Sequence, residues 1–281
     1  MTSRCIVCES SEADSLYSGV LKCRACDYVY ADLNLSQEEF ESFYTAGYFK
    51  GDEYSDYLED KAVHQLNFSK RLDVLNRYLD PDKHRSALEI GCAYGFFLEL
   101  AAKQFDYVAG VDVTEEGVAH ARDVLNLNAY QTDLLEWDFE SRKFDVVCMW
   151  DTIEHLRAPD LYLNMISENM PSGGVLAVTT GDISSKMAQF RKNNWRLIHP
   201  PTHAHYFSRD SITKLLDRYG FDLLHFEHCG FYRSVDNIAY NLFALRSNLS
   251  WLYKMMKLFH VTGWNIYANL YDIMYVVARR R

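Results

Sequence analysis

The stretch Ala87-Leu-Glu-Ile-Gly-Cys-Ala-Tyr-Gly-Phe-Phe-Leu-Glu-Leu100 decides the fold. An apolar strand enters a glycine turn at Gly91, and an apolar helix follows at once. In α/β proteins such a turn lies at the carboxyl end of a strand, where small residues let the backbone approach a ligand. A dinucleotide fingerprint that starts at Gly91 needs glycine at positions 93 and 96, where this chain has Ala93 and Phe96. The spacing therefore argues against NAD.

The rest of the chain after Arg85 alternates strand and helix patterns. Strands are expected at 86–91, 107–112, 128–132, 144–150, 174–180, 221–228 and 271–279. Helices are expected at 94–104, 115–126, 158–170 and 208–219. This alternation implies right-handed βαβ units and a mainly parallel sheet, which is an α/β fold.

The glycine turn resembles a known cofactor motif. Glu89-x-Gly91-x-Ala93-x-Gly95 is similar to motif I of class I S-adenosylmethionine (SAM) methyltransferases, [DE]-x-G-x-G-x-G, with alanine at the middle glycine. Further segments of that superfamily follow in order across residues 85–180. They include Asp151-Thr-Ile-Glu-His155-Leu, which resembles D-x-x-E-H-L, and Met170-Pro-Ser-Gly-Gly-Val-Leu, which resembles L-x-P-G-G-x-L. The resemblance implies a Rossmann-like sheet of seven strands with the last strand antiparallel.

The same resemblance implies a set of cofactor contacts. Asp112 ends the second strand, 21 residues after Gly91, where a carboxylate can accept both hydroxyls of a ribose, although alone it could cap a helix. Asp133 and Leu134 follow the third strand, where the family contacts adenine, and a simple turn is the alternative there. The SAM-binding residues expected are Glu89, Gly91, Ala93, Gly95, Asp112, Asp133, Leu134 and Trp150.

Residues 1–33 carry two cysteine pairs, Cys5-x-x-Cys8 and Cys23-x-x-Cys26, separated by 14 residues. Four thiolates at this spacing favour a closed tetrahedral Zn²⁺ site of structural type, and hence a small zinc ribbon. About 30 residues hold too little core to fold alone, so the metal would supply much of the folding free energy. The alternatives are four unrelated thiols or a redox pair.

Two histidine segments are candidates for the chemistry. His199-Pro-Pro-Thr-His203-Ala-His205-Tyr-Phe-Ser208 resembles the [PH]-E-H-x-x-Y-F-S signature of methyltransferases fused to an N-terminal zinc domain, which include deoxysugar C-methyltransferases and enzymes of glycan gene clusters. In the sugar enzymes a histidine after strand 4 and the signature histidine are implicated in catalysis. Carried over, these are His155 and His203, and Tyr48 or Tyr54 matches a contributing tyrosine ahead of the core.

Other interpretations of these residues stay open. Thr202 replaces the signature glutamate, and the large C-terminal domain of the C-methyltransferases is missing, so O-methylation is at least as well supported as C-methylation. The histidines could instead cap the helix near Ser208 or bond to backbone. Asp151, Glu154 and His155 could also hold a divalent ion that polarises an acceptor hydroxyl.

Three segments make up the expected organisation. A zinc ribbon spans 1–33, a helical linker or substrate-cap segment spans 34–80, and the SAM-binding domain spans 81–281. Within the last, residues 231–270 form an aromatic-rich helical insertion before the final strand. Four interpretations compete for it: an acceptor-site cover, a dimer surface, a helix in peripheral contact with a membrane, or a plain core helix. The oligomeric state is not predicted.

Composition limits the partners and the compartment. The formal net charge is −10, so no overall basic field favours nucleic acid. An apolar leader is missing at the start of the sequence, no stretch has the length of a membrane span, and seven cysteines with two close pairs suggest a reducing compartment. These features predict a cytoplasmic protein.

The leading hypothesis is SAM-dependent methyl transfer to a sugar, a nucleotide-sugar or a glycan precursor, with a histidine as general base. An rRNA or tRNA methyltransferase with a zinc module is the first alternative, and the acidic charge and sparse basic residues of 1–33 argue against it. A non-catalytic zinc-ribbon interaction protein is the second.

Overall fold

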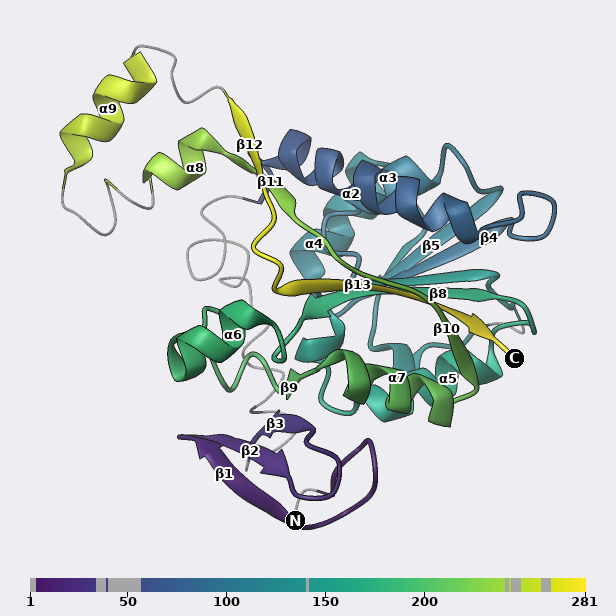
Figure 1. Ribbon diagram of the computed structural model, residues 1–281. Coiled ribbons are helices and arrows are strands. Elements are labelled where there is room, and N and C mark those ends of the chain that lie inside the picture. Colours follow the sequence, from purple (N-terminus) through teal and green to yellow (C-terminus); the bar gives the residue numbers. More distant parts are fainter. Residues whose placement is uncertain are drawn as a thin grey trace.

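A computed structural model describes residues 4–33, 39, 57–139, 142–240, 243, 249–258 and 264–281 (Figure 1). At its centre is a sheet with the strand order β10-β13-β8-β7-β4-β5-β6. The strands are β4 (Ser86–Ile90), β5 (Tyr107–Asp112), β6 (Ala129–Gln131), β7 (Val146–Trp150), β8 (Val175–Gly181), β10 (Phe221–His228) and β13 (Ile273–Arg280). The strands β6, β5, β4, β7 and β8 pair in parallel, whereas β13 is antiparallel to β8 and β10. The expected α/β fold with an antiparallel last strand is confirmed.

Helices cover both faces of this sheet. Figure 1 shows α2 (Lys61–Leu75) and α3 (Phe96–Ala101) on one side, and α5 (Pro159–Glu168) and α7 (Arg209–Arg218) on the other. Successive strand residues point to opposite faces, so Val147 and Met149 join the hydrophobic cluster of α5 and α7, while Val146 and Cys148 join the cluster of α2 and α3. The remaining helical elements of the core are α4 (Glu115–Ala119), a π-helical turn His120–Val124, α6 (Lys186–Arg191), and 3-10 turns at Asn76–Tyr78, Leu134–Glu136, Ile153–His155 and Lys192–Asn194.

The cysteine-bearing segment forms β1 (Ala13–Tyr17), β2 (Val20–Cys23) and β3 (Val29–Ala31). A short strand of the main domain, β9 (His205–Tyr206), extends this sheet by pairing antiparallel with β3. Tyr28 and Cys23 are also buried in the same hydrophobic cluster as α5 and α7. The ribbon therefore shares both backbone pairing and core with the main domain, which the sequence did not predict.

The insertion before the last strand contains α8 (Val235–Ala239) and α9 (Ser250–Leu258), which project from the rest of the molecule in Figure 1. It also begins and ends with strands β11 (Phe231–Ser234) and β12 (Asn265–Ala268), which pair antiparallel and were not expected. None of the residues of α9 is buried, so the interpretation of this segment as a plain core helix is wrong. In the part of the chain that the structure describes, no helix is both long and apolar enough to span a membrane.

Candidate functional site

The turn after β4 has the backbone of a ligand loop. Gly91 and Gly95 both have φ of +77°, and Ala93 has φ of +44°. A Cβ on Gly91 would lie 2.5 Å from Oγ1 of Thr152, and one on Gly95 would lie 2.8 Å from Cβ of Ala121. Glycine is therefore required at both positions, because a side chain would meet left-handed backbone strain and a clash together. Ala93 tolerates the same left-handed backbone at the position where motif I has its middle glycine.

Asp112 at the end of β5 is held against this turn. One carboxylate oxygen accepts a hydrogen bond from the backbone N–H of Ala93 at 2.8 Å, and the other accepts from the N–H and hydroxyl of Thr114 at 2.9 and 2.5 Å. Thr114, not Asp112, occupies the N-cap of α4. Burial raises the pKa of Asp112, and the hydrogen bonds from Thr114 and Ala93 oppose that rise. The carboxylate thus lies at the mouth of the loop, where its role in ribose binding stays a prediction.

Two buried polar atoms lie on neighbouring strands beside the loop. Oε2 of Glu89 on β4 and Nε1 of Trp150 on β7 have no hydrogen-bond partner among the residues that the structure describes. Glu89 is 2% exposed, and its burial, together with the charge of Asp112, raises its pKa well above the usual range. Unpartnered buried polar atoms are uncommon in folded proteins and indicate a missing ligand or water. A bound SAM molecule, with its cationic amino group and carboxylate, has groups of the kinds that these two atoms can contact.

Asp133 and Leu134 lie at the start of a 3-10 turn after β6. Asp133 caps the 3-10 turn, because one oxygen accepts from the N–H of Leu135 at 2.8 Å while the other accepts from the hydroxyl of Tyr162. Leu134 is 1% exposed within the hydrophobic core. The turn interpretation describes what is observed here, and adenine contact by these residues remains a prediction.

His155 and His203 meet at the carboxyl end of β7, although they are distant in the sequence. Their ring centroids lie 4.5 Å apart, and the ring of His199 lies 3.9 Å from that of His203. Nδ1 of His155 lies 3.0 Å from the carbonyl oxygen of Thr202, and Nδ1 of His203 lies 3.0 Å from that of Leu197. A carbonyl oxygen only accepts, so both Nδ1 atoms carry the proton and both Nε2 atoms carry the lone pair.

Burial keeps these two imidazoles neutral. It lowers the pKa of His155 to about 4, and the pKa of His203 to about 2 with further lowering by the neighbouring charges of His155 and His199. The neutral form is the one that can accept a proton or bind a metal ion. Capping of α7 by a histidine is not observed, since Ser208 forms a capping box with Ser211.

Arg71, which the sequence argument missed, reaches the same strand end from α2. Its guanidinium contacts the carboxylate of Asp151 at 2.5 Å, and Asp151 also accepts from the hydroxyl of Thr179 at 3.0 Å. Arg71 is only 9% exposed and lies on the same helix as the buried Phe68 and Leu72. In the sequence, the signal for Arg71 was a charged residue within the apolar stripe of this helix. Asp151 therefore faces Arg71 and does not join Glu154 and His155, with which the sequence grouped it.

Glu154 lies beside His155 and His203 instead. It is 4% exposed, and its Oε2 lacks a hydrogen-bond partner within the described ranges. Burial, with the negative charge of Asp151, raises the pKa of this carboxyl to about 8. Its backbone carbonyl accepts from the N–H of Ala204, which ties the end of β7 to the segment that carries His203.

The four cysteines of the ribbon converge on one point. The sulfurs of Cys5 and Cys26 lie 3.5 Å apart, as do those of Cys8 and Cys23, and all four lie within 4.8 Å of one another. A tetrahedral Zn²⁺ ion with Zn–S bonds of about 2.3 Å requires sulfurs about 3.8 Å apart. The thiols are not paired as disulfides. The arrangement therefore fits structural Zn²⁺, and the four residues that would hold it are the four expected.

The ribbon also contacts the histidine segment directly. The N–H of Ala31 on β3 donates to the carbonyl oxygen of Ala204 at 2.8 Å, and the hydroxyl of Tyr28 lies 2.5 Å from Nδ1 of His205. His203 thus precedes a strand that the ribbon holds in register. Tyr48, the tyrosine expected to contribute to catalysis, lies outside the described residues, as does Tyr54.

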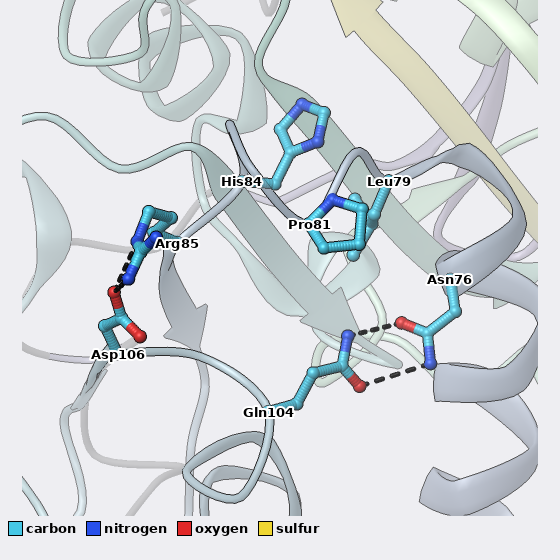
Figure 2. A pocket seen from close by; sticks show the side chains of 7 residues that line it. All are labelled: Asn76, Leu79, Pro81, His84, Arg85, Gln104 and Asp106. Carbon is cyan, nitrogen blue, oxygen red and sulfur yellow. Dashed lines mark hydrogen bonds and ion pairs between the residues drawn. The ribbon is translucent and has the colours of Figure 1, made fainter.

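A pocket at the opposite end of the sheet is not the candidate site. Figure 2 shows it at the start of β4, where Asn76 and Gln104 bond to each other through their side-chain amides and Arg85 pairs with Asp106. Ligands of open α/β sheets bind at the carboxyl ends of the strands, and this pocket lies at the amino end. Four of its polar side chains are also already paired with one another.

Comparisons with known proteins agree with this geometry. A family model described as a methyltransferase domain matches residues 63–226. The chain is 27% identical over 157 residues to a ubiquinone biosynthesis O-methyltransferase of Histophilus somni, a match that covers 52% of this chain and 64% of that enzyme. It is 28% identical over 165 residues to a probable S-adenosylmethionine-dependent methyltransferase of Mycobacterium tuberculosis, covering 58% of each chain. The chain thus spans less than two thirds of these relatives.

Among solved structures, the fold is similar to that of magnesium protoporphyrin IX methyltransferase from Synechocystis with bound S-adenosylhomocysteine. The TM-score is 0.53 at 16% identity, and the match covers 86% of this chain and 97% of that one. At this identity the likeness concerns the fold alone.

Proposed function

We propose, because the chain belongs to the methyltransferase-domain family, that it transfers the methyl group of SAM to a hydroxyl oxygen of a sugar, a nucleotide-sugar or a glycan precursor. The observation that carries this proposal is the meeting of His155 and His203, with ring centroids 4.5 Å apart, at the end of the strand that bears Trp150. The end of β7 therefore carries Trp150, whose Nε1 has no partner among the described residues, next to the two histidines proposed as acid–base groups.

Residues of the loop and of the adjoining strands would hold the cofactor. Gly91 and Gly95 let the backbone approach it, Asp112 is available to the ribose, and Glu89 with Trp150 is available to the amino-acid part. When bound, SAM supplies a methyl group on a sulfonium that is already activated for displacement. The protein then has to orient an acceptor oxygen, exclude water and remove one proton.

A neutral histidine is the group proposed to take that proton. Nε2 is the basic nitrogen of both His155 and His203, because each Nδ1–H faces a backbone carbonyl. Burial favours the neutral imidazole, so the base is in its accepting form throughout the physiological pH range. The signature glutamate is replaced by Thr202, whose carbonyl oxygen orients His155 instead.

The choice of oxygen over carbon as the acceptor rests on two features. The relative from Histophilus somni is named an O-methyltransferase, and Thr202 stands where the signature of the sugar C-methyltransferases has glutamate. A sugar acceptor is supported by the likeness of His199–Ser208 to the zinc-bearing family alone. The test therefore includes an assay that identifies the class of acceptor.

The test is thermal unfolding with and without SAM, followed by turnover of two histidine variants. A ligand at about 100 times its Kd stabilises the folded state by about 2.7 kcal/mol. We expect SAM to stabilise wild type and His203→Asn alike, and His203→Asn to lower kcat by about 10²- to 10⁴-fold, the usual contribution of a general base. His84→Asn, which changes a histidine at the amino end of the sheet, is the control and should retain most of its turnover.

The acceptor assay uses nucleotide-sugars, simple phenols and tRNA in parallel. Methylated nucleotide-sugar is the expected product. Absence of any SAM stabilisation would refute the proposal and favour the non-catalytic alternative. Methylation of tRNA alone would favour the RNA alternative, and methylation of phenols alone would move the acceptor away from sugars.

A further inference from the structure

Three side chains beside the methyl-transfer site point their ligand atoms at one another. Glu154 and His155 are consecutive at the end of β7, and His203 comes from the loop before β9. One carboxylate oxygen and two ring nitrogens from these residues lie within 4.8 Å of one another. They are distinct from the cysteine cluster, which is the other such group found among the described residues.

The orientation of the two imidazoles is the one that metal-binding histidines adopt. Histidine ligands usually donate their second ring N–H to a backbone carbonyl or carboxylate, which fixes the tautomer and the ring direction. Here the carbonyl oxygens of Thr202 and Leu197 each lie 3.0 Å from an Nδ1 atom. Nε2 is therefore the nitrogen of each ring through which coordination would occur.

The carboxyl of Glu154 provides a second, independent observation. The carboxyl is 96% buried, and one of its oxygens has no hydrogen-bond partner among the described residues, so the lost hydration of that oxygen is costly. Arg71, whose positive charge acts on Glu154, already contacts Asp151. A cation between Glu154 and the histidines would supply the missing partner.

We infer that Glu154, His155 and His203 form a centre for one divalent transition-metal ion beyond the carboxyl end of β7. Two nitrogens and one oxygen suit Mn²⁺, Fe²⁺, Co²⁺ or Zn²⁺, whereas Mg²⁺ prefers oxygen ligands alone. Ligand atoms bonded to one ion at about 2.1 Å in a tetrahedral arrangement lie about 3.4 Å apart, so a pair at the 4.8 Å limit of this cluster would have to close by about 1.4 Å. Three protein ligands leave coordination positions open for an acceptor oxygen.

This centre deepens the proposed function, on which its catalytic role rests. The acceptor hydroxyl would bind the ion, which lowers the pKa of that hydroxyl so that its proton leaves to solvent water. The acceptor oxygen then forms the new O–CH3 bond while the S–CH3 bond of SAM breaks, and that electron pair stays on sulfur to give neutral S-adenosylhomocysteine. In this form of the mechanism the two imidazoles act as ligands and the ion replaces the general base.

The experiment is a Co²⁺ titration of the full chain loaded with one equivalent of Zn²⁺ for the cysteine cluster and freed of any further Zn²⁺, followed by visible absorption and metal analysis. Wild type should bind one Co²⁺ per chain beyond the ribbon zinc, with d–d absorption of nitrogen and oxygen ligation and without the intense thiolate charge-transfer bands. Glu154→Gln and His203→Asn should each weaken Co²⁺ binding at least 100-fold. The control His84→Asn changes a histidine at the amino end of the sheet and should bind Co²⁺ as wild type does.

Each outcome decides between the two proposals. No second metal ion at saturating Co²⁺, or equal binding by all variants, would overturn the metal centre. If SAM stabilisation and turnover persist in that case, the proposed function stands with a histidine base. If Co²⁺ binds as expected but SAM does not stabilise the protein, the metal centre stands and the proposed function fails.

Discussion

The N-terminal ribbon and the C-terminal arm, residues 231–268, are both additions to the same sheet, and they attach to it in opposite ways. The ribbon buries its apolar side chains in the cluster shared with α5 and α7, and its strand β3 pairs with β9. The arm is joined at its base, while its outer helix α9 has no buried residue. Burial and backbone pairing thus fix the ribbon against the segment that follows His203, whereas the outer helix of the arm is exposed.

The base of the arm is anchored to α2. The side-chain amide of Asn67 donates to the carbonyl oxygen of Tyr232 at 3.1 Å and accepts from its N–H at 2.6 Å, as a neighbouring strand would. Beyond that anchor, exposed aromatic and apolar side chains accumulate. Trp251 is 62% exposed and Trp264 is 74% exposed.

The charge of the arm differs from that of the whole chain. Residues 231–270 contain one acidic residue, Asp236, against Arg233, Arg246, Lys254 and Lys257, within a chain of net charge −10. A helix that combines exposed tryptophan with lysine suits the interface of an anionic bilayer. Peripheral contact of this arm with a membrane remains a prediction.

The largest effect should come from breaking the ribbon. Cys23→Ser removes one of four ligands, and structural zinc sites contribute on the order of 10 kcal/mol to folding of their small domains. We therefore expect loss of the bound zinc, loss of ribbon order, and a drop in turnover of more than tenfold, because β9 loses its partner strand next to His203. Metal analysis, thermal unfolding and a turnover assay measure these three effects.

Cys229→Ser is the control for this prediction, since it changes a cysteine outside the cluster. It should keep its zinc. Full turnover by a zinc-free Cys23→Ser protein would mean that the ribbon does not position the histidine segment.

A smaller effect should come from loosening the ribbon without removing its metal. Tyr28→Phe deletes a hydroxyl that lies 2.5 Å from His205 in a fully buried contact, leaving the imidazole without that partner. We expect a loss of about 1–3 kcal/mol in the free energy of unfolding, with zinc retained, as measured by urea denaturation. Tyr17→Phe on β1 serves for comparison, and an equal loss in both variants would argue against a specific role of the Tyr28 contact.

The smallest effect on stability should come from the arm. The double change Trp251→Ser and Trp264→Ser alters exposed side chains, so the free energy of unfolding should change by no more than about 0.5 kcal/mol per site. Co-sedimentation with vesicles of phosphatidylglycerol and phosphatidylcholine should fall by more than fivefold. Phe190→Ser, which changes an 83% exposed aromatic on α6, should bind vesicles as wild type does. Unchanged vesicle binding by the double variant would end the membrane interpretation.

The strands and helices of the core were predictable because each depends on a local pattern. The apolar run before Gly91, the glycine turn and the helix after it lie within fifteen residues, and the expected strands agree with β4 to β8, β10 and β13 within two residues. The cysteine cluster was predictable for the same reason, since paired Cys-x-x-Cys units bring their own ligands together.

The pairings between distant segments were not predictable. The pairing of β3 with β9 and that of β11 with β12 join residues far apart in the chain. Strands this short show no hydrophobic periodicity in the sequence. The contact of Arg71 with Asp151 belongs to the same group, because a helix ahead of the sheet reaches the end of its fourth parallel strand.

The sequence by itself determined the α/β class, the ligand loop at Gly91 and the four cysteines, since these follow from neighbouring residues and their spacing. Only the tertiary structure decided that Glu154, His155 and His203 share one buried point, and that Asp151 does not join them. The physical reason is that desolvation and charge pairing depend on which groups the fold brings together. Arg71 neutralises Asp151, and the carboxyl of Glu154 is left facing two imidazoles.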